Sequence, residues 1–109
     1  MKAASREILL GFWKTHILYH AGESPIHGQW ILLELRRHGY ELSPGTLYPL
    51  LNQMERLGWI KGKCDPNGGV RARKDYQLTA EGRKVLKVLR EQIRELHREV
   101  VLGQGSHRT

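Results

Sequence analysis

The chain has 109 residues, which is enough for one hydrophobic core and too few for two. Its 18 Lys and Arg residues against 11 Asp and Glu residues give a net charge of +7, which suits nucleic acid or an anionic membrane surface. The single cysteine, Cys64, excludes an internal disulfide. The early charges argue against a secretory signal and no apolar run is long enough to span a membrane, so we expect a cytoplasmic protein.

Two helices are predicted in the first part of the chain. Apolar residues recur at helical spacing from about Ser5 to Ala21, and the stretch Gly22–Pro25 ends this helix. A second apolar stripe predicts a helix from about His27 to His38, with Gly39 just past its end.

The start of a third helix is located by its prolines. Pro49 cannot lie deep inside a helix, because it lacks an N–H group and clashes with the preceding turn. A start near Gly45 or Thr46 leaves Pro49 in the first turn, where an N–H group would have no partner. We therefore predict a helix from about Thr46 to Leu57, ended by Gly58. The residues expected to face the core are Leu47, Leu50, Leu51, Met54 and Leu57.

A β-hairpin is predicted next. Its arms, Trp59–Cys64 and Arg71–Leu78, alternate weakly between apolar and polar residues and are separated by the turn residues Asp65–Gly69. The cations on these arms are Lys61, Lys63, Arg71, Arg73 and Lys74. Against DNA they would contact flanking phosphates and supply affinity rather than sequence choice; otherwise they belong to a solvated hairpin.

A long last helix is predicted from about Ala80 to Leu102, with Thr79 as its N-cap and Gly103–Thr109 as a flexible tail. Apolar residues along it, at alternating spacings of three and four, form a narrow seam: Leu86, Leu89, Ile93, Leu96 and Val100. Such a seam packs on the chain's own first helix, on a second copy, or on both. We predict a homodimer whose interface also includes Phe12 and Trp13.

The order of elements predicts a mainly α fold with a small β-hairpin. We expect a winged helix-turn-helix DNA-binding domain in residues 1–78, a dimerisation helix in residues 79–102 and a tail in residues 103–109. The third helix would enter the major groove of double-stranded DNA. Its candidate contact residues are Ser43, Gly45, Thr46, Tyr48, Pro49, Asn52 and Gln53. A two-fold dimer predicts a pseudo-palindromic site.

The stretches Leu42–Leu51 and Met54–Ile60 resemble the recognition-helix signature of PadR-type transcriptional regulators. Further segments with this likeness are Pro25–Gly28, Gly68–Gly69, Arg73–Lys74, Tyr76 and Leu78–Arg83. The resemblance covers about residues 12 to 90. It implies a dimeric cytoplasmic repressor that dimerises mainly through its last helix, in a family where many members are released from DNA by small aromatic effectors.

Aromatic and histidine residues of the predicted first helix suggest two ligand sites, and each also has a purely structural interpretation. Trp13 and Tyr19 could line a pocket for a flat apolar effector, or could be ordinary core or interface residues. His16 and His20, at positions i and i+4, could hold a metal ion together with His97, which would make the chain a metal-responsive regulator. Surface and interface histidines are far commoner, so we expect no metal and no cofactor.

An enzyme and a protein-binding module are the two alternatives to a DNA-binding regulator. The sequence contains no nucleophile–base pair, phosphate-binding glycine loop or carboxylate pair that would indicate an enzyme. A winged-helix module that binds protein instead of DNA remains the alternative. Such a module would not need cations on the hairpin or polar groups along the outer face of the third helix.

Overall fold

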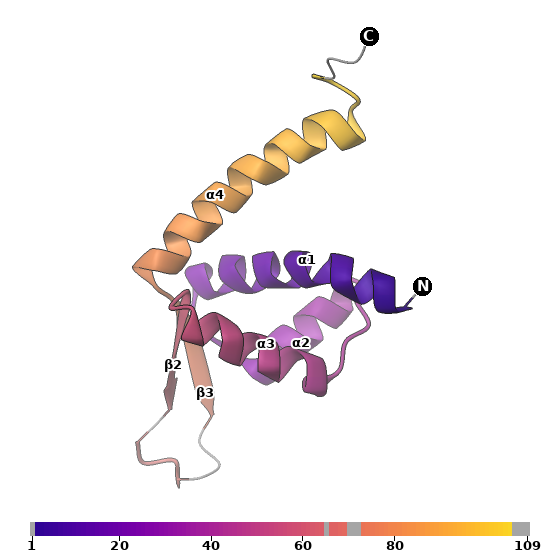
Figure 1. Cartoon of the computed structure of the whole chain (residues 1–109). Coiled ribbons are helices and arrows are strands. Elements are labelled where there is room, and N and C mark those ends of the chain that lie inside the picture. The colour runs from indigo at the N-terminus through magenta and orange to yellow at the C-terminus, as the bar shows by residue number, and fades with distance from the viewer. Residues whose placement is uncertain (1, 65, 70–72, 106–109) are drawn as a thin grey trace.

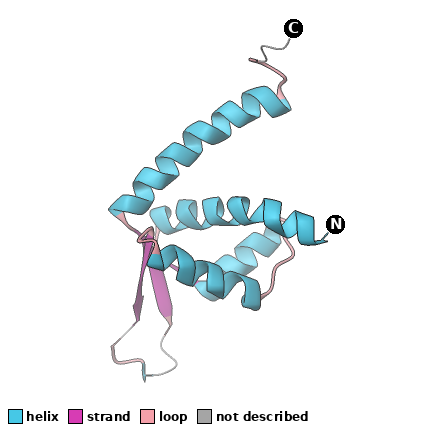
Figure 2. Ribbon diagram, viewed as in Figure 1, coloured by secondary structure: helices cyan, strands magenta, loops and turns pink. Residues whose placement is uncertain are grey.

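The computed structural model describes residues 2–64, 66–69 and 73–105. Its elements are α1 (Lys2–Glu23), β1 (Ile26–His27), α2 (Gly28–Arg37), α3 (Pro44–Arg56), β2 (Ile60–Cys64), β3 (Lys74–Leu78), α4 (Ala80–Leu96) and the π-helical η2 (His97–Val101). Helices α1, α2 and α3 form one body, the β2–β3 hairpin projects from it, and α4 diverges from α1 (Figure 1). Helices predominate over strands, as expected for a winged helix-turn-helix (Figure 2).

The core of the chain is apolar and lies between the three body helices, the sheet and the first turns of α4. Its buried side chains are Trp13, Ile17, Leu18, Ala21, Ile26, Ile31, Leu32, Leu35, Leu42, Leu47, Leu50, Leu51, Met54, Ile60, Tyr76 and Leu86. Leu57 was expected in this core but is half exposed, because α3 ends at Arg56 and Leu57 is its C-cap. The other four core residues predicted on this helix are buried.

Helix α1 extends beyond both predicted ends, and Gly22 lies inside it rather than ending it. A Cβ atom at this position would lie 2.9 Å from Leu78 Cδ2, so a glycine lets the helix pass close to β3. The short strand β1 was not predicted, since two residues carry no periodicity. Ile26 pairs with Tyr76 and His27 with Asp75, which gives an antiparallel sheet of order β1-β3-β2.

The predicted start of α3 is wrong. The helix begins at Pro44, after the extended residue Ser43, so Pro49 lies inside it. Pro44 is well suited to a first helical turn, where a missing N–H group costs nothing. Pro49 cannot donate the helical hydrogen bond that would reach the carbonyl of Gly45, and Gly45 is exposed, where solvent can replace the missing donor.

The last helix begins as predicted and changes type near its end. Thr79 Oγ1 accepts a hydrogen bond from the N–H group of Gly82 at 2.9 Å, which makes it the N-cap. The α-helix stops at Leu96, and residues His97–Val101 continue as a π-helix with Leu102 as the C-cap, so the helical segment reaches the predicted end with a change of helix type. The wider π turn shifts the end of the seam around the helix axis.

The shape of the molecule reflects the divergence of α4. Its radius of gyration is 16.1 Å and its extents are 63 × 33 × 22 Å. A compact domain of this length would have a radius of gyration of about 13 Å. Much of α4 and η2 therefore lies outside the body, with one side uncovered. Among the described residues, no helix has the length and apolarity needed to cross a bilayer.

Candidate nucleic-acid interface

Helix α3 presents a polar face away from the core. Leu47, Leu50, Leu51 and Met54 anchor its other face in the core. The residues on its exposed side and at its start are Ser43, Gly45, Tyr48, Pro49, Asn52 and Gln53, with Thr46 half buried. The structure therefore brings the predicted contact residues of this helix together on one accessible surface, where a protruding helix fits a major groove.

Tyr48 has a structural role as well as an exposed surface. Its ring lies over the start of α2: a Cβ atom on Gly28 would lie 2.5 Å from Tyr48 Cε1 and 2.7 Å from the hydroxyl oxygen. Gly28 is buried there, while Tyr48 remains 41% exposed. The close approach of the two residues sets how α2 and α3 pack at this end of the helix-turn-helix.

The start of α3 carries polar groups that the helix itself does not use. Ser43 has an extended backbone, and its side chain makes no cap hydrogen bond to the helix. The hydroxyl lies 3.5 Å from Thr46 Oγ1, a long contact for a pair of hydroxyl groups. Both hydroxyls are therefore available to a phosphate oxygen, close to the partial positive charge of a helix N-terminus.

The wing carries exposed cations that were predicted to contact DNA. Lys61 and Lys63 are exposed on β2, and in the described parts of the chain neither forms an ion pair. Arg73 is exposed and pairs with Asp75, with its Nε atom 3.1 Å from Oδ1. Arg71, also predicted to contact DNA, lies outside the described residues.

Lys74 is placed differently from the other wing cations. Its Nζ atom donates to Glu55 Oε1 at 2.8 Å and lies 5.4 Å from the centre of the Tyr76 ring, on the inner side of the hairpin. Glu55 Oε2 also accepts from the N–H group of Gly62 at 2.9 Å. These bonds tie the wing to α3 and give Lys74 a structural role, and its predicted contact with DNA stays a prediction.

The electrostatics of this tie agree with its geometry. The hydrogen bond from Lys74 is the main reason that the pKa of Glu55 lies below its ordinary value, and the backbone bond from Gly62 lowers it further. The same bond to Glu55 raises the pKa of Lys74. Glu55 was missed in the sequence because an acidic residue among polar ones on a helix has no distinctive pattern.

The segment from the last turns of α1 to the middle of α4, residues 17–88, matches the family model "Transcriptional regulator PadR-like family". The chain is a PadR-like transcriptional regulator. It is 43% identical over 100 residues to the transcriptional regulator Rv3488 of Mycobacterium tuberculosis (strain ATCC 25618 / H37Rv), covering 92% of each chain. Regulators of this family act on DNA and are not enzymes, as predicted from the sequence.

Solved structures agree with this membership. A PadR family regulator from Eggerthella lenta DSM 2243 has a TM-score of 0.77 and 30% identity, covering 95% of this chain and 93% of the other. A PadR-like regulator from Bacillus cereus strain ATCC 14579 has a TM-score of 0.77 and 27% identity, covering 92% of this chain and 99% of the other. The predicted family and the predicted winged-helix fold are thus confirmed.

In this PadR-like chain the predicted dimer seam divides into two parts. Leu86 is buried in the chain's own core, and Leu89 is half buried against it. Beyond them Ile93 is 46%, Leu96 55% and Val100 70% exposed. The first turns of α4 therefore pack within the subunit, while its second half keeps an uncovered apolar side.

The two residues of α1 that were predicted in the dimer interface differ in their burial. Phe12 is 49% exposed, whereas Trp13 is 2% exposed and packs edge-on against Tyr40, with ring centres 6.2 Å apart. Trp13 is therefore a core residue of the subunit, and we correct its assignment to the interface and to an effector pocket. An i to i+1 step turns a helix by about 100°, which is why neighbouring residues face such different surroundings.

An open groove of about 850 Å³ lies between α1 and α4. Apolar side chains from both helices line it, including Phe12, Tyr19, Ile93 and Leu96. Tyr19 thus lies where an effector was predicted, with its hydroxyl donating to Glu23 Oε1 at 3.1 Å. His16 and His20 lie along the same groove.

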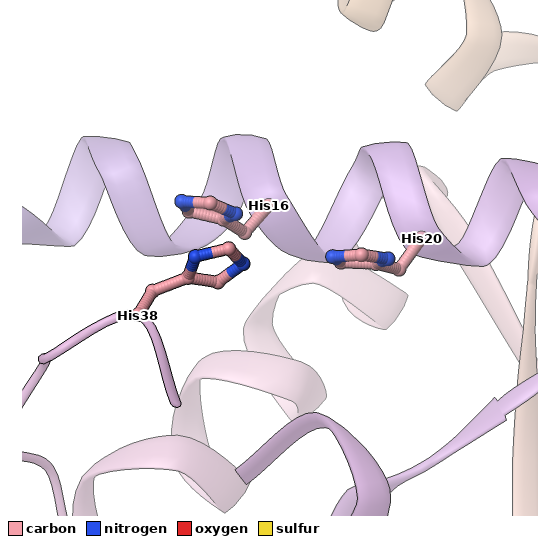
Figure 3. A group of neighbouring side chains, drawn as sticks. All are labelled: His16, His20 and His38. Atoms are coloured by element: carbon pink, nitrogen blue, oxygen red, sulfur yellow. The ribbon is translucent and has the colours of Figure 1, made fainter. Parts of the chain in front are cut away.

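The histidines of α1 have a different third neighbour from the predicted one. In the described part of the chain, His38 at the end of α2, and not His97, lies beside His16 and His20 (Figure 3). Glu34 adds a carboxylate, with Oε2 3.3 Å from His38 Nε2 and 3.6 Å from His20 Nε2. His38 was missed because only the packing of α2 on α1 brings it to this place.

Proposed function

We propose that this PadR-like chain acts as a homodimer on a pseudo-palindromic operator in double-stranded DNA. In this proposal the exposed face of α3 contacts base edges and phosphates in the major groove, and the wing contacts the flanking backbone. The observation that carries it is the segregation of α3 into an apolar side anchored in the core and an exposed polar side, together with the exposed cations Lys61 and Lys63 on β2.

The uncovered side of α4 supports the homodimer. Ile93 and Leu96 expose apolar surface together, and Phe12 adds to it from α1 across the groove. A contiguous apolar patch of this kind is normally covered by another protein surface. A second copy of the same helix fits best, because a two-fold axis through the seam brings like residues against like.

Within the dimer, the groove between α1 and α4 is a reasonable place for a small aromatic effector. Its wall of Phe12, Tyr19 and Leu96 offers apolar contact, and polar groups at its edge offer orientation. We propose that the chain represses transcription and that an effector bound there changes the spacing of the two α3 helices. This part of the proposal also rests on the family resemblance.

Selection of bound duplexes from a random pool tests the proposal. The expected outcome is a two-fold symmetric site whose half-sites lie about one helical turn apart, roughly 10 base pairs. Replacement of Asn52 by alanine should relax the preference at one position of each half-site. A protein-interaction module would instead bind no duplex even at low salt, and that result would refute the proposed function.

A further inference from the structure

Three histidines from two helices converge at the edge of the groove between α1 and α4. His16 and His20 project from the same side of α1, and His38 reaches them from the end of α2 (Figure 3). Each offers one ring nitrogen, and these three atoms all lie within 4.8 Å of one another. We propose that these side chains form a binding site for a divalent transition-metal ion of the zinc and cobalt class.

The separations suit such an ion after small side-chain rotations. Nitrogen ligands bound to zinc at 2.0–2.1 Å in tetrahedral geometry lie about 3.3 Å from one another. The rings of His16 and His38 already have centres 4.9 Å apart, and those of His16 and His20 are 6.2 Å apart and nearly parallel. His16 and His20 stand at positions i and i+4 of α1, a spacing at which two histidines on one helix bind a single ion. The proposal therefore calls for side-chain rotation that draws the three nitrogens together, without a change of the helix.

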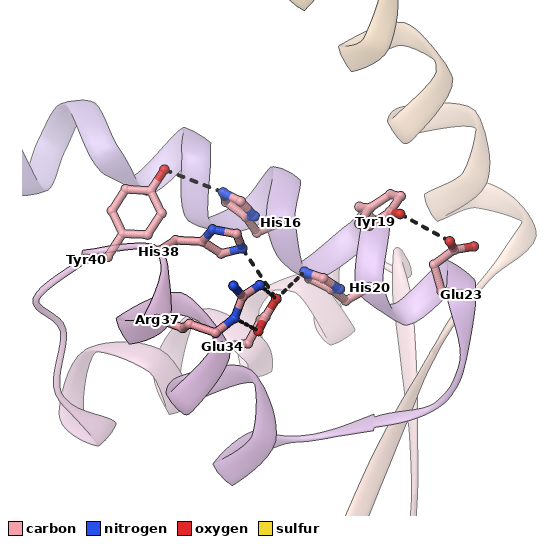
Figure 4. A network of polar contacts seen from close by, with 8 residues as sticks. All are labelled: His16, Tyr19, His20, Glu23, Glu34, Arg37, His38 and Tyr40. Carbon is pink, nitrogen blue, oxygen red and sulfur yellow. Dashed lines mark hydrogen bonds and ion pairs between the residues drawn. The ribbon is translucent and has the colours of Figure 1, made fainter.

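The existing contacts of the three rings are weak enough to be exchanged for a metal bond. Tyr40 Oη and His16 Nε2 lie 3.5 Å apart. Glu34 Oε2 lies 3.3 Å from His38 Nε2 and 3.6 Å from His20 Nε2 (Figure 4). All three distances exceed the usual 2.7–3.2 Å of a hydrogen bond between nitrogen and oxygen. Without a metal ion, these contacts give the three histidine rings only long hydrogen bonds.

The site also contains a carboxylate, which is paired with a guanidinium. Glu34 is held by Arg37, whose Nε atom donates to Oε1 at 2.8 Å, and this bond is the main reason that the pKa of Glu34 is lowered to about 2. The carboxylate is therefore ionised beside the rings.

The ligand set selects the class of ion. Three imidazoles suit zinc, cobalt, nickel and copper, whereas calcium and magnesium require oxygen ligands. The opening of the groove leaves the remaining coordination positions to water. His38 is the residue directly after α2, and His16 and His20 lie on α1. A bound ion would therefore link α2, the first helix of the helix-turn-helix, to α1.

The test is a titration of the untagged, metal-free chain with Co²⁺, followed by its visible absorption. The expected result is one ion per chain, with the strong bands of low-symmetry cobalt. His38→Gln and His20→Gln should each weaken binding by at least about tenfold. The matched control is His97→Gln, an exposed histidine outside the cluster, which should bind cobalt as the unmodified chain does.

Thermal unfolding with Zn²⁺ is a second measurement, which distinguishes loss of metal binding from misfolding of a variant. Zn²⁺ should raise the Tm of the unmodified chain and of His97→Gln by mass action, and should leave the Tm of His38→Gln nearly unchanged. Absence of cobalt binding would overturn the proposal. Equal binding in all variants would overturn it as well, because the ion would then sit on unrelated surface groups. Neither result bears on operator binding, which is measured separately with chelator present.

Discussion

Single residues explain how the wing is held at a defined angle to α3. Glu55 receives hydrogen bonds from Lys74 and from the backbone of Gly62, and thereby joins the helix to both strands. A Cβ atom on Gly62 would collide with the Lys74 side chain, so the glycine makes room for this tie. A cation predicted to contact DNA thus also stabilises the fold.

The Glu55 tie predicts a pH-dependent contribution to stability. Because the pKa of Glu55 is lower in the folded chain, its contribution is complete above the ordinary value of 4.5 and is lost as the pH falls through the folded value. Glu55→Gln should lower the free energy of unfolding by about 1 kcal/mol at about pH 7, with the difference shrinking in acid.

Urea unfolding of the two proteins across this pH range measures the effect. The matched control is Glu91→Gln, an exposed glutamate on α4, which should change stability little at any pH. An unchanged difference between Glu55→Gln and the parent chain down to acid pH would contradict the role of the ionised carboxylate.

Pairs of elements depend on close contacts, and α2 approaches α3 closely where Gly28 meets the Tyr48 ring. Gly28→Ala should destabilise the chain by about 1–3 kcal/mol, since the new methyl group meets the Tyr48 ring. Combining it with Tyr48→Ala should recover part of the loss, which a double-mutant cycle measures.

Gly45→Ala is the control for the Gly28 experiment. This glycine also lies near the start of a helix, but a Cβ atom there would meet only Ser43 Oγ, at an ordinary 3.6 Å. Its replacement should leave the Tm unchanged or slightly raised. If Gly28→Ala were equally harmless, the packing of Tyr48 on α2 would not constrain the two helices.

The exposed lysines of the wing are expected to contribute to DNA affinity and not to the stability of the fold. Lys61→Ala and Lys63→Ala should each weaken binding to all duplexes about equally and reduce the salt slope by about 1, because each removes one phosphate contact. Fluorescence anisotropy at several salt concentrations gives these slopes. The control Lys87→Ala, on the exposed side of α4, should leave the slope intact.

At the scale of the whole molecule, the divergent α4 is explained by a partner helix. Ile93→Glu places a charge in the exposed part of the seam and should convert a dimer into a monomer, with loss of tight operator binding. Light scattering coupled to size exclusion measures the mass. Val88→Glu, on the opposite side of the same helix and 54% exposed, should remain dimeric.

Local patterns in the sequence were sufficient for the element order, the family and most of the core. Helical spacing located α1, α2 and α4, turn residues located the hairpin, and Thr79 marked the start of α4. These features depend on residues within one or two turns of each other, so they can be recognised without knowing the fold.

Contacts between distant segments decided the remainder. The pairing of Lys74 with Glu55, the burial of Trp13 beside Tyr40 and the meeting of His38 with α1 each join separate elements. The same holds for β1, which exists only because β3 lies beside it. Whether a side chain faces DNA, the core or a metal depends on how helices and strands pack, and this packing is set by long-range contacts that no local pattern contains.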